Sequence, residues 1–308
     1  MTAAATATID SRQAIIDFMT GFTTETTPGS AAKIPDYRDH LRPGTTVYIT
    51  FLPGSDFNDT IAVTKRLQSE GFDPVPHFAA RSIPNVRFFE DNLKRVTEEC
   101  GVSRVLAIAG AVKHPVGDFT DSMQLLDTGL FDKYGIKTIG LAAHPEGSPD
   151  MSDEAIADAL AWKNSFAERT DADCHLVTQF CFEAEPIIAW DKKLNQEGNR
   201  LPIDIGIPGV ASLKSLLGHA KACGVGASMQ VLTKQAKHIH KLLLVQTPDK
   251  QVRDLAEYKA ADPDCGIRGL HMYPLGGLKR SAQWSYAVTD GHIETGAKKG
   301  FSPTIKLD

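Results

Sequence analysis

The feature that most constrains this chain is an alternation of short apolar, β-branched runs with longer amphipathic runs, repeated eight times. The short runs are predicted strands, and they cover residues 21–26, 46–51, 73–78, 104–110, 137–143, 175–180, 203–208 and 266–273. Several of them, such as RVLAIAG and KTIGLAA, are almost continuously apolar. Such runs are typical of parallel strands that are covered on both faces.

The amphipathic runs between the strands carry helical periodicity. The predicted helices cover residues 59–71, 85–100, 118–133, 150–170, 183–197, 212–223, 233–245 and 279–288. Eight strand–helix units fit a (β/α)8 TIM barrel better than an open sheet. We therefore expect residues 1–308 to form one barrel domain with a short N-terminal extension. Residues 1–10 are expected to be disordered, and the 210–264 crossover is long enough for an extra helix.

Composition excludes several classes of protein. The chain has 33 Lys and Arg against 38 Asp and Glu, a net charge of −5 that offers no basic surface to nucleic acid. Its longest apolar runs, such as residues 242–245, are too short to cross a bilayer, and the N-terminus lacks the pattern of a secretory signal. The five cysteines suggest neither a disulfide framework nor a zinc site. We expect a cytoplasmic protein without metal, nucleic-acid or membrane partners.

Chemistry in a barrel of this type is found at the carboxyl ends of the strands. The predicted ends carry Glu25, Thr50, His77, Gly110, Ala111, His144, Gln179, Phe180 and Tyr273. Taken singly, Glu25 is more often an exposed loop carboxylate and His77 more often a structural histidine. A carboxylate at a barrel mouth can instead act as a general acid, because partial burial lets it keep its proton.

Other enzyme classes find less support in the sequence. A Schiff-base aldolase needs a lysine at a strand end, and the nearby Lys113 lies in the loop beyond Gly110. His238 and His240 have metal-ligand spacing, but they fall in a predicted helix, where positions two apart face different ways. The GVGASM string at residues 224–229 lacks the third glycine of a dinucleotide fingerprint.

Motifs at the predicted strand ends form an ordered set. They are Glu25 with Pro28, Ile49-Thr50-Phe51, Pro76-His77, His144-Pro145-Glu146-Gly147, Thr178-Gln179-Phe180 with Phe182, and Pro208-Gly209. This set resembles the methylenetetrahydrofolate reductase family, the flavin-dependent barrel enzymes of one-carbon metabolism. The resemblance spans roughly residues 25–286, and its most specific parts are the Thr-Gln-Phe-x-Phe string and the His-Pro-Glu-Gly turn.

The resemblance implies a mechanism and a set of site residues. FAD would bind at the barrel mouth, take electrons from NAD(P)H and pass hydride to the methylene carbon of a tetrahydrofolate derivative. Glu25 matches the acid that protonates the folate N10 and so assists ring opening. The positions that match cofactor contacts are Thr50, His77, Gly110, Ala111, Ala142 and His144, with Asn164 at the adenosine end. Gln179, Phe180 and Tyr273 match substrate-binding positions, and a homo-oligomer is expected.

Several positions depart from the family pattern, including Ser148, where the family often has a histidine, and a loop after Pro208-Gly209 that is shorter by two residues. Ala111 stands where the family has an aspartate, His144 replaces the usual tyrosine, and Glu168 falls near an expected phosphate-binding lysine. Loss of the aspartate should stabilise an anionic reduced flavin and so favour methyltetrahydrofolate oxidation, because a like charge is removed from the pocket. Two alternatives stay open at this point: a flavin-free folate methyltransferase, and a non-catalytic folate-binding subunit.

Overall fold

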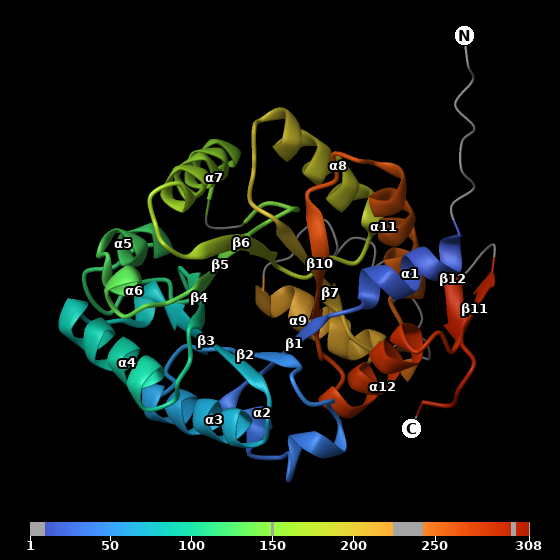
Figure 1. Ribbon diagram of the computed structural model, residues 1–308, viewed down its shortest axis with the longest axis horizontal. Helices are drawn as coiled ribbons and strands as arrows, with labels where there is room; N and C mark the ends of the chain where they lie inside the picture. Colours follow the sequence, from blue (N-terminus) through green and yellow to red (C-terminus); the bar gives the residue numbers. More distant parts are fainter. Residues whose placement is uncertain (1–9, 149–150, 224–242, 297–299, 308) are drawn as a thin grey trace.

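The computed structural model describes residues 10–148, 151–223, 243–296 and 300–307, and it is built around a closed barrel of eight parallel strands. Their spatial order is β1-β10-β7-β6-β5-β4-β3-β2. The strands are β1 Thr23–Thr26, β2 Thr46–Ile49, β3 Asp73–Ala79, β4 Arg104–Ile108, β5 Thr138–Ala143, β6 Asp173–Thr178, β7 Ile203–Pro208 and β10 Ile267–Tyr273. Figure 1 shows them at the centre, with helices outside. The predicted (β/α)8 barrel is confirmed.

Helices cover the outside of the barrel and bury an apolar core against it. They are α2 Pro28–Ala31, α3 Phe57–Ser69, α4 Val86–Glu98, α5 Ser122–Asp127, α6 Leu130–Lys133, α7 Asp153–Ala167, α8 Ala184–Gln196, α9 Leu213–Cys223, α11 Asp249–Ala261 and α12 Leu278–Thr289. Some of the longer helices begin at polar caps that the sequence supplies: in α3 the Asp56 side chain accepts from the Asn58 amide, and in α7 the Ser152 side chain accepts from the Ala155 amide. No described helix is long and apolar enough to cross a membrane.

Two predicted helices are wrong in detail. The predicted helix at residues 118–133 is two short helices, α5 and α6, separated at Gly129, whose φ of 68° is left-handed and interrupts the helix. The predicted helix at residues 233–245 lies mostly outside the described residues. Its last residue instead belongs to β9 Val245–Gln246, which pairs antiparallel with β8 Ala211–Ser212. The extra helix expected in the 210–264 crossover is confirmed, because both α9 and α11 lie there.

Two terminal additions were missed in the sequence. Helix α1 Ser11–Met19 begins at the Asp10 side chain, which caps the Arg12 and Gln13 amides, and it buries Phe18 against the barrel. An antiparallel hairpin, β11 Ile293–Gly296 with β12 Gly300–Pro303, follows α12. Figure 1 shows α1 and this hairpin beside α11 and α12, on one flank of the barrel. Residues 1–9, the rest of the segment expected to be disordered, lie outside the described residues.

The interior of the barrel is more polar than its outer core. Its apolar part is a small cluster of Tyr48, Val75, Leu106 and Val177. Three buried histidines and one buried aspartate accompany this cluster: His77, His175, His271 and Asp204. Burying ionisable groups costs free energy unless they are partnered or neutral, so each of these needs a structural explanation.

Candidate active site

Glu25 lies on β1, near the carboxyl end of the strand and beside β2. Its side chain is 15% exposed, so it is neither a free surface carboxylate nor fully buried. The Thr50 hydroxyl donates a 3.1 Å hydrogen bond to Glu25 Oε2. The parallel register, which pairs Glu25 with Tyr48 and Thr26 with Ile49, places Thr50 just beyond the end of β2 at this level. The structure therefore brings Glu25 and Thr50 together.

His77 is fully buried on β3, and neither of its ring nitrogens has a hydrogen-bond partner among the described residues. Burial lowers the pKa of His77 to about 4, and the nearby Glu25 carboxylate opposes this shift only in part. The imidazole is thus neutral near pH 7. Its ring packs edge-on to Tyr48, with ring centroids 5.9 Å apart. An unsatisfied buried imidazole beside a site carboxylate is unusual, and it indicates a place for a polar ligand group.

His271 is the site residue that the sequence reasoning missed. It lies on β10 with 1% of its surface exposed, and its Nε2 is 3.7 Å from Glu25 Oε2. The alternation of β10 carried a signal, because His271 and Tyr273 are two residues apart and so face the same side of the strand. Of this strand, only the last residue, Tyr273, was predicted to belong to the site.

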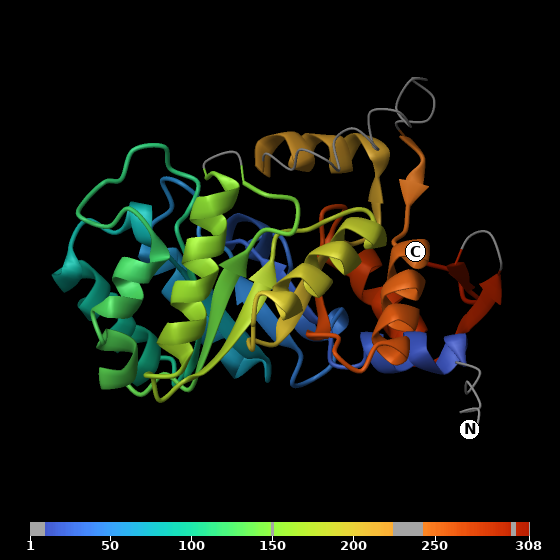
Figure 2. The same ribbon diagram turned by 90° about the horizontal axis from the view of Figure 1, so that it is seen from above.

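The expected substrate residues lie beneath α9. Figure 2 shows this helix on the side of the barrel to which the carboxyl ends of the strands point. Phe180 is buried there against α9 residues, and its ring is 5.2 Å from that of Tyr273. The Tyr273 hydroxyl donates to the Thr178 carbonyl at 2.9 Å. Phe180 is therefore a packing residue that supports Tyr273 from behind, whereas Gln179 and Tyr273 themselves are only partly buried.

The Tyr273 ring needs a glycine beside it. A Cβ at Gly206 would come within 2.7 Å of Tyr273 Cε2 and 2.5 Å of the Thr178 carbonyl oxygen, so a larger residue would displace the ring. Gln179 accepts a 3.0 Å hydrogen bond from the Phe180 amide through its Oε1. Its amide nitrogen has no recorded partner in the part of the chain that the structure describes, and it is available to a ligand.

Gly110 and Ala111 follow β4. Gly110 has a φ of 87°, and a Cβ there would meet the Ala79 Cβ at 3.0 Å, so the turn requires glycine. This turn carries the next residue, Ala111, to an exposed position. Ala111 therefore lies at the rim of the mouth, beyond the end of β4.

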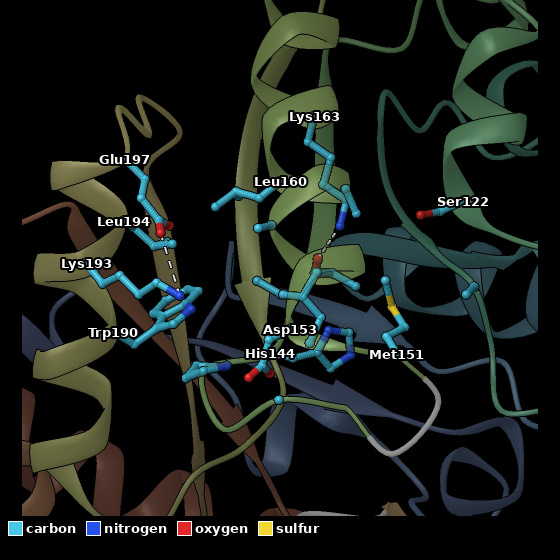
Figure 3. A pocket seen from close by; sticks show the side chains of 18 of the residues that line it. Ser122, His144, Met151, Asp153, Leu160, Lys163, Trp190, Lys193, Leu194 and Glu197 are labelled. Atoms are coloured by element: carbon cyan, nitrogen blue, oxygen red, sulfur yellow. Dashed lines mark hydrogen bonds and ion pairs between the residues drawn. The ribbon is translucent and has the colours of Figure 1, made fainter.

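A cavity of about 400 Å3 opens beside the ends of β4 and β5 and runs between α5, α7 and α8. Ala142 and His144 line it where it meets the barrel mouth, and Trp190 lines it on α8. Figure 3 shows Lys163 of α7 pointing into this region, with its ammonium group beside the β5 backbone. Lys163 Nζ donates a 2.6 Å hydrogen bond to the Ala142 carbonyl oxygen.

Lys163 is the second functional candidate that the sequence reasoning missed. It is 9% exposed, and burial lowers its pKa to about 8. Of its three N–H donors, one is used by Ala142. A buried amine with spare donors on a cavity wall is suited to an anionic ligand.

Asn164, predicted to lie at the adenosine end of the cofactor, and Glu168 do not line this cavity. The Asn164 amide donates to the Leu160 carbonyl and to Asn199 Oδ1, both at 3.0 Å, and Asn164 is not among the residues that line the cavity. Asn199 belongs to the connection from α8 to β7, at the opposite end of the barrel from the mouth. Glu168 pairs with Arg200 at 2.9 Å on the surface. The structure thus places Lys163, and neither of these two residues, on the cavity.

Comparison with known sequences and structures bears on this geometry. The sequence model of the family described as methylenetetrahydrofolate reductase matches residues 36–276. The chain belongs to this family. The matched segment runs from β2 through β10, so it contains the Thr50, His77, Gln179 and Tyr273 positions. Family membership assigns the barrel to folate-related reduction or binding.

Solved structures with the same fold include an uncharacterized protein from Clostridium thermocellum, which is described as binding two copies of 5-methyl-5,6,7,8-tetrahydrofolic acid. That protein is 14% identical, with a TM-score of 0.52 over 90% of this chain and 97% of the other. A mutant tryptophan synthase α-subunit from Pyrococcus furiosus is 11% identical, with a TM-score of 0.46 over 88% and 95%. The first similarity supports the barrel fold.

Proposed function

We propose that this protein interconverts 5,10-methylenetetrahydrofolate and 5-methyltetrahydrofolate, with FAD carrying the hydride and NAD(P)H as the external reductant. The observation that carries the proposal is the pairing of Glu25 with Thr50 at the mouth of a barrel of this family. NAD(P)H, or an equivalent two-electron donor, is required because conversion of a methylene bridge to a methyl group consumes two electrons.

Glu25 has the setting of a general acid. Its Oε2 accepts from Thr50 and faces His271, whereas Oε1 has no recorded partner among the described residues and is available to the substrate. Ring opening breaks the bond between the methylene carbon and N10. A nitrogen is a poor leaving group until it is protonated, so a carboxylic acid held against it lowers the barrier. In this proposal Glu25 donates that proton from Oε1.

Gln179 and Tyr273 would hold the pterin. The Gln179 amide nitrogen, at the end of β6, has no hydrogen-bond partner among the described residues, and the Tyr273 ring offers a flat apolar surface beside it. A pterin presents carbonyl and ring-nitrogen acceptors on a planar ring, which suits one amide donor and one aromatic neighbour. The Tyr273 hydroxyl is tied to the Thr178 carbonyl, so the ring is fixed before substrate arrives.

The residues present fit FAD on two observations. His77 keeps two unsatisfied buried nitrogens at the mouth, and the cavity that runs from His144 to Lys163 offers a long slot with a buried cation. Thr50, His77 and Gly110 would border the flavin ring. Ala142, His144 and Lys163 would meet the pyrophosphate, and the Trp190 ring would face the adenine. Bound FAD supplies a group that accepts and donates hydride.

The test is NAD(P)H consumption that depends on 5,10-methylenetetrahydrofolate. We expect consumption by the protein loaded with FAD and formation of 5-methyltetrahydrofolate in equal amount. A protein that binds 5-methyltetrahydrofolate but catalyses no consumption with either NADH or NADPH, with and without added FAD, would contradict the proposal. That result would favour a flavin-free methyltransferase or a folate-binding subunit.

A further inference from the structure

The His271 imidazole is held in one orientation beside the Oε2 atom of Glu25. Its Nδ1 is 2.8 Å from the Thr23 hydroxyl, and its Nε2 is 3.7 Å from Glu25 Oε2. The parallel register of β1 and β10 pairs Thr23 with His271 directly, so this contact is set by the barrel itself. Two aromatic rings pack edge-on against the imidazole, with centroids 4.6 Å away at Tyr48 and 4.8 Å away at Tyr273. The ring cannot turn without disturbing three strands.

The two nitrogens of His271 therefore have different partners. If Nδ1 carried the hydrogen, the Nε2 lone pair would face a carboxylate oxygen, which is repulsive. If the Thr23 hydroxyl donates to Nδ1, the hydrogen lies on Nε2 and faces Glu25 Oε2 favourably. The second arrangement gives Oε2 two neighbouring donors, Thr50 and His271, and leaves Oε1 for the substrate.

We infer that His271 is a positioning residue for the proton of Glu25: its Nε2–H, fixed by Thr23, stabilises the carboxylate that forms when Glu25 protonates the folate nitrogen. This inference rests on the proposed function. In that step the O–H bond of Glu25 breaks and an N–H bond forms at N10. The bond from N10 to the methylene carbon breaks and its electron pair stays on N10, while the N5 lone pair forms a C=N bond to the same carbon, so that the resulting iminium can accept the hydride. The negative charge left on Glu25 is stabilised by the Thr50 hydroxyl and by the N–H of His271 that faces it.

The surroundings of His271 make Glu25 its main electrostatic partner. The titratable groups that face it are Glu25 on β1, Tyr48 on β2, His77 on β3, His175 on β6 and Tyr273 on β10. Burial lowers the pKa of both His77 and His175 to about 4, so both are neutral near pH 7. Asp204 is ion-paired with Arg268 and faces His175.

The experiment compares His271→Asn, Thr23→Val and the matched control Thr24→Val. Thr24 is the neighbouring β1 threonine, but its hydroxyl donates to the Met272 carbonyl at 3.1 Å and does not touch the imidazole. Thr23→Val keeps the side-chain volume, so it tests the role even where His271→Asn folds poorly. The readouts are kcat and KM for 5,10-methylenetetrahydrofolate across pH, and the tautomer of His271 by 15N NMR of the purified protein.

We expect His271→Asn to lower kcat by roughly tenfold, because the carboxylate loses the electrostatic stabilisation of an N–H that faces it from 3.7 Å, with KM within about twofold. The alkaline limb of the kcat profile should move to higher pH, because a carboxylate that has lost a donor keeps its proton longer. Thr23→Val should shift the limb in the same direction, and Thr24→Val should not. NMR should show Nε2 protonated in the wild-type protein.

Three results would overturn the inference. One is an unchanged kcat and pH profile in His271→Asn when the wild-type protein is active. Another is a general loss of rate in which the limb does not move, since that marks a structural role. The third is an Nδ1–H tautomer in the wild-type spectrum. Failure of the proposed function is a separate result, seen as a wild-type protein that catalyses no folate interconversion, and it would remove this inference as well.

Discussion

Lys163 Nζ and the Ala142 carbonyl oxygen are joined by a 2.6 Å hydrogen bond across the wall of the cavity between α5, α7 and α8. The bond ties the middle of α7 to the end of β5, where the residues proposed to bind the cofactor begin. It leaves two donors of a buried amine facing the cavity. Burial of this ammonium group lowers the free energy of unfolding of the protein without cofactor. The same group would stabilise an anion bound in the cavity.

Replacing Lys163 should weaken FAD binding. We expect Lys163→Met to raise the dissociation constant for FAD at least tenfold at pH 7, because a charge-assisted contact to the pyrophosphate is lost. Flavin fluorescence quenching measures this constant directly. The control is Lys193→Met, since Lys193 lines the same cavity but its side chain is 61% exposed and pairs with Glu197 at 3.6 Å. Equal loss of affinity in both variants would contradict the assignment to Lys163.

The same Lys163→Met variant should be more stable than wild type in the absence of cofactor. The folded-state pKa of about 8 lies below the ordinary lysine pKa of 10.5, so the unfolded chain binds more protons between these two pH values. Stability must therefore rise as pH increases from 8 to 10.5. Near pH 7 the buried charge costs roughly 3 kcal/mol, less the hydrogen bond to Ala142. Urea unfolding at pH 7 and pH 10 should show a flatter pH dependence in the variant.

His77 should make the protein acid-sensitive. Its folded-state pKa of about 4 lies below the ordinary 6.5, so the folded protein binds fewer protons than the unfolded chain in this range. The free energy of unfolding is therefore unaffected by His77 above pH 6.5, and it decreases by roughly 3 kcal/mol as the pH falls from 6.5 to 4. His77→Leu should reduce the loss of unfolding free energy across this window. His219→Asn, at an exposed position, should leave it unchanged. The prediction is wrong if the unfolding free energy changes with pH equally in His77→Leu and in the wild-type protein.

Glu25 should be needed for turnover but not for folate binding. We expect Glu25→Gln to lower kcat by about 10²–10⁴, the range for loss of a general acid, while 5-methyltetrahydrofolate still binds in calorimetry. Thr50→Val should cause a smaller decrease, because it removes one donor from Oε2. Thr46→Val is the matched control, since Thr46 bonds Asp73 at the other end of β2. Full activity in Glu25→Gln would exclude an acid role for this residue.

Much of this architecture could be predicted from local sequence. Strands such as β4 and β5 are apolar runs that can be identified alone, whereas β1 is the short polar string Thr23–Thr26 and is identified only as part of the repeating pattern. The predicted strand ends located Glu25, Thr50, His77 and Tyr273. The break at Gly129 could not be predicted reliably, because a glycine is tolerated within many helices until its φ becomes positive. Helix α1 was not predicted, because its local signals, the Asp10 cap and the spacing of Ile15 and Phe18, cover only nine residues, and a helix this short depends on packing against α11 and α12.

The site residues that escaped prediction depend on contacts between distant segments. The importance of His271 comes from Glu25, which lies on the opposite end of the chain and becomes a neighbour only when the barrel closes between β1 and β10. Lys163 was overlooked in favour of Asn164 because one residue on a helix changes the direction by about 100°. Lys163 and Asn164 both fall in the predicted helix at residues 150–170, and only the packed structure shows that Lys163 lines the cavity and Asn164 does not.

Ala111 should raise the midpoint potential of the bound flavin. In the proposed function this residue leaves the flavin without a nearby carboxylate, which stabilises the anionic reduced form and helps methyltetrahydrofolate oxidation. Ala111→Asp should lower the midpoint potential of the bound flavin, measured by spectroelectrochemistry. Its exposed position makes the substitution compatible with folding. A midpoint that is unchanged or higher in Ala111→Asp would rule out this effect.

The central claim is that a flavin and a folate react in this barrel. It is tested most directly by the visible absorption spectrum of the FAD-loaded protein, recorded without oxygen before and after addition of 5-methyltetrahydrofolate. We predict a flavin band that bleaches on addition of the folate and persists in Glu25→Gln. A protein that binds 5-methyltetrahydrofolate but takes up no FAD, or a bound flavin whose band does not change, would contradict the account.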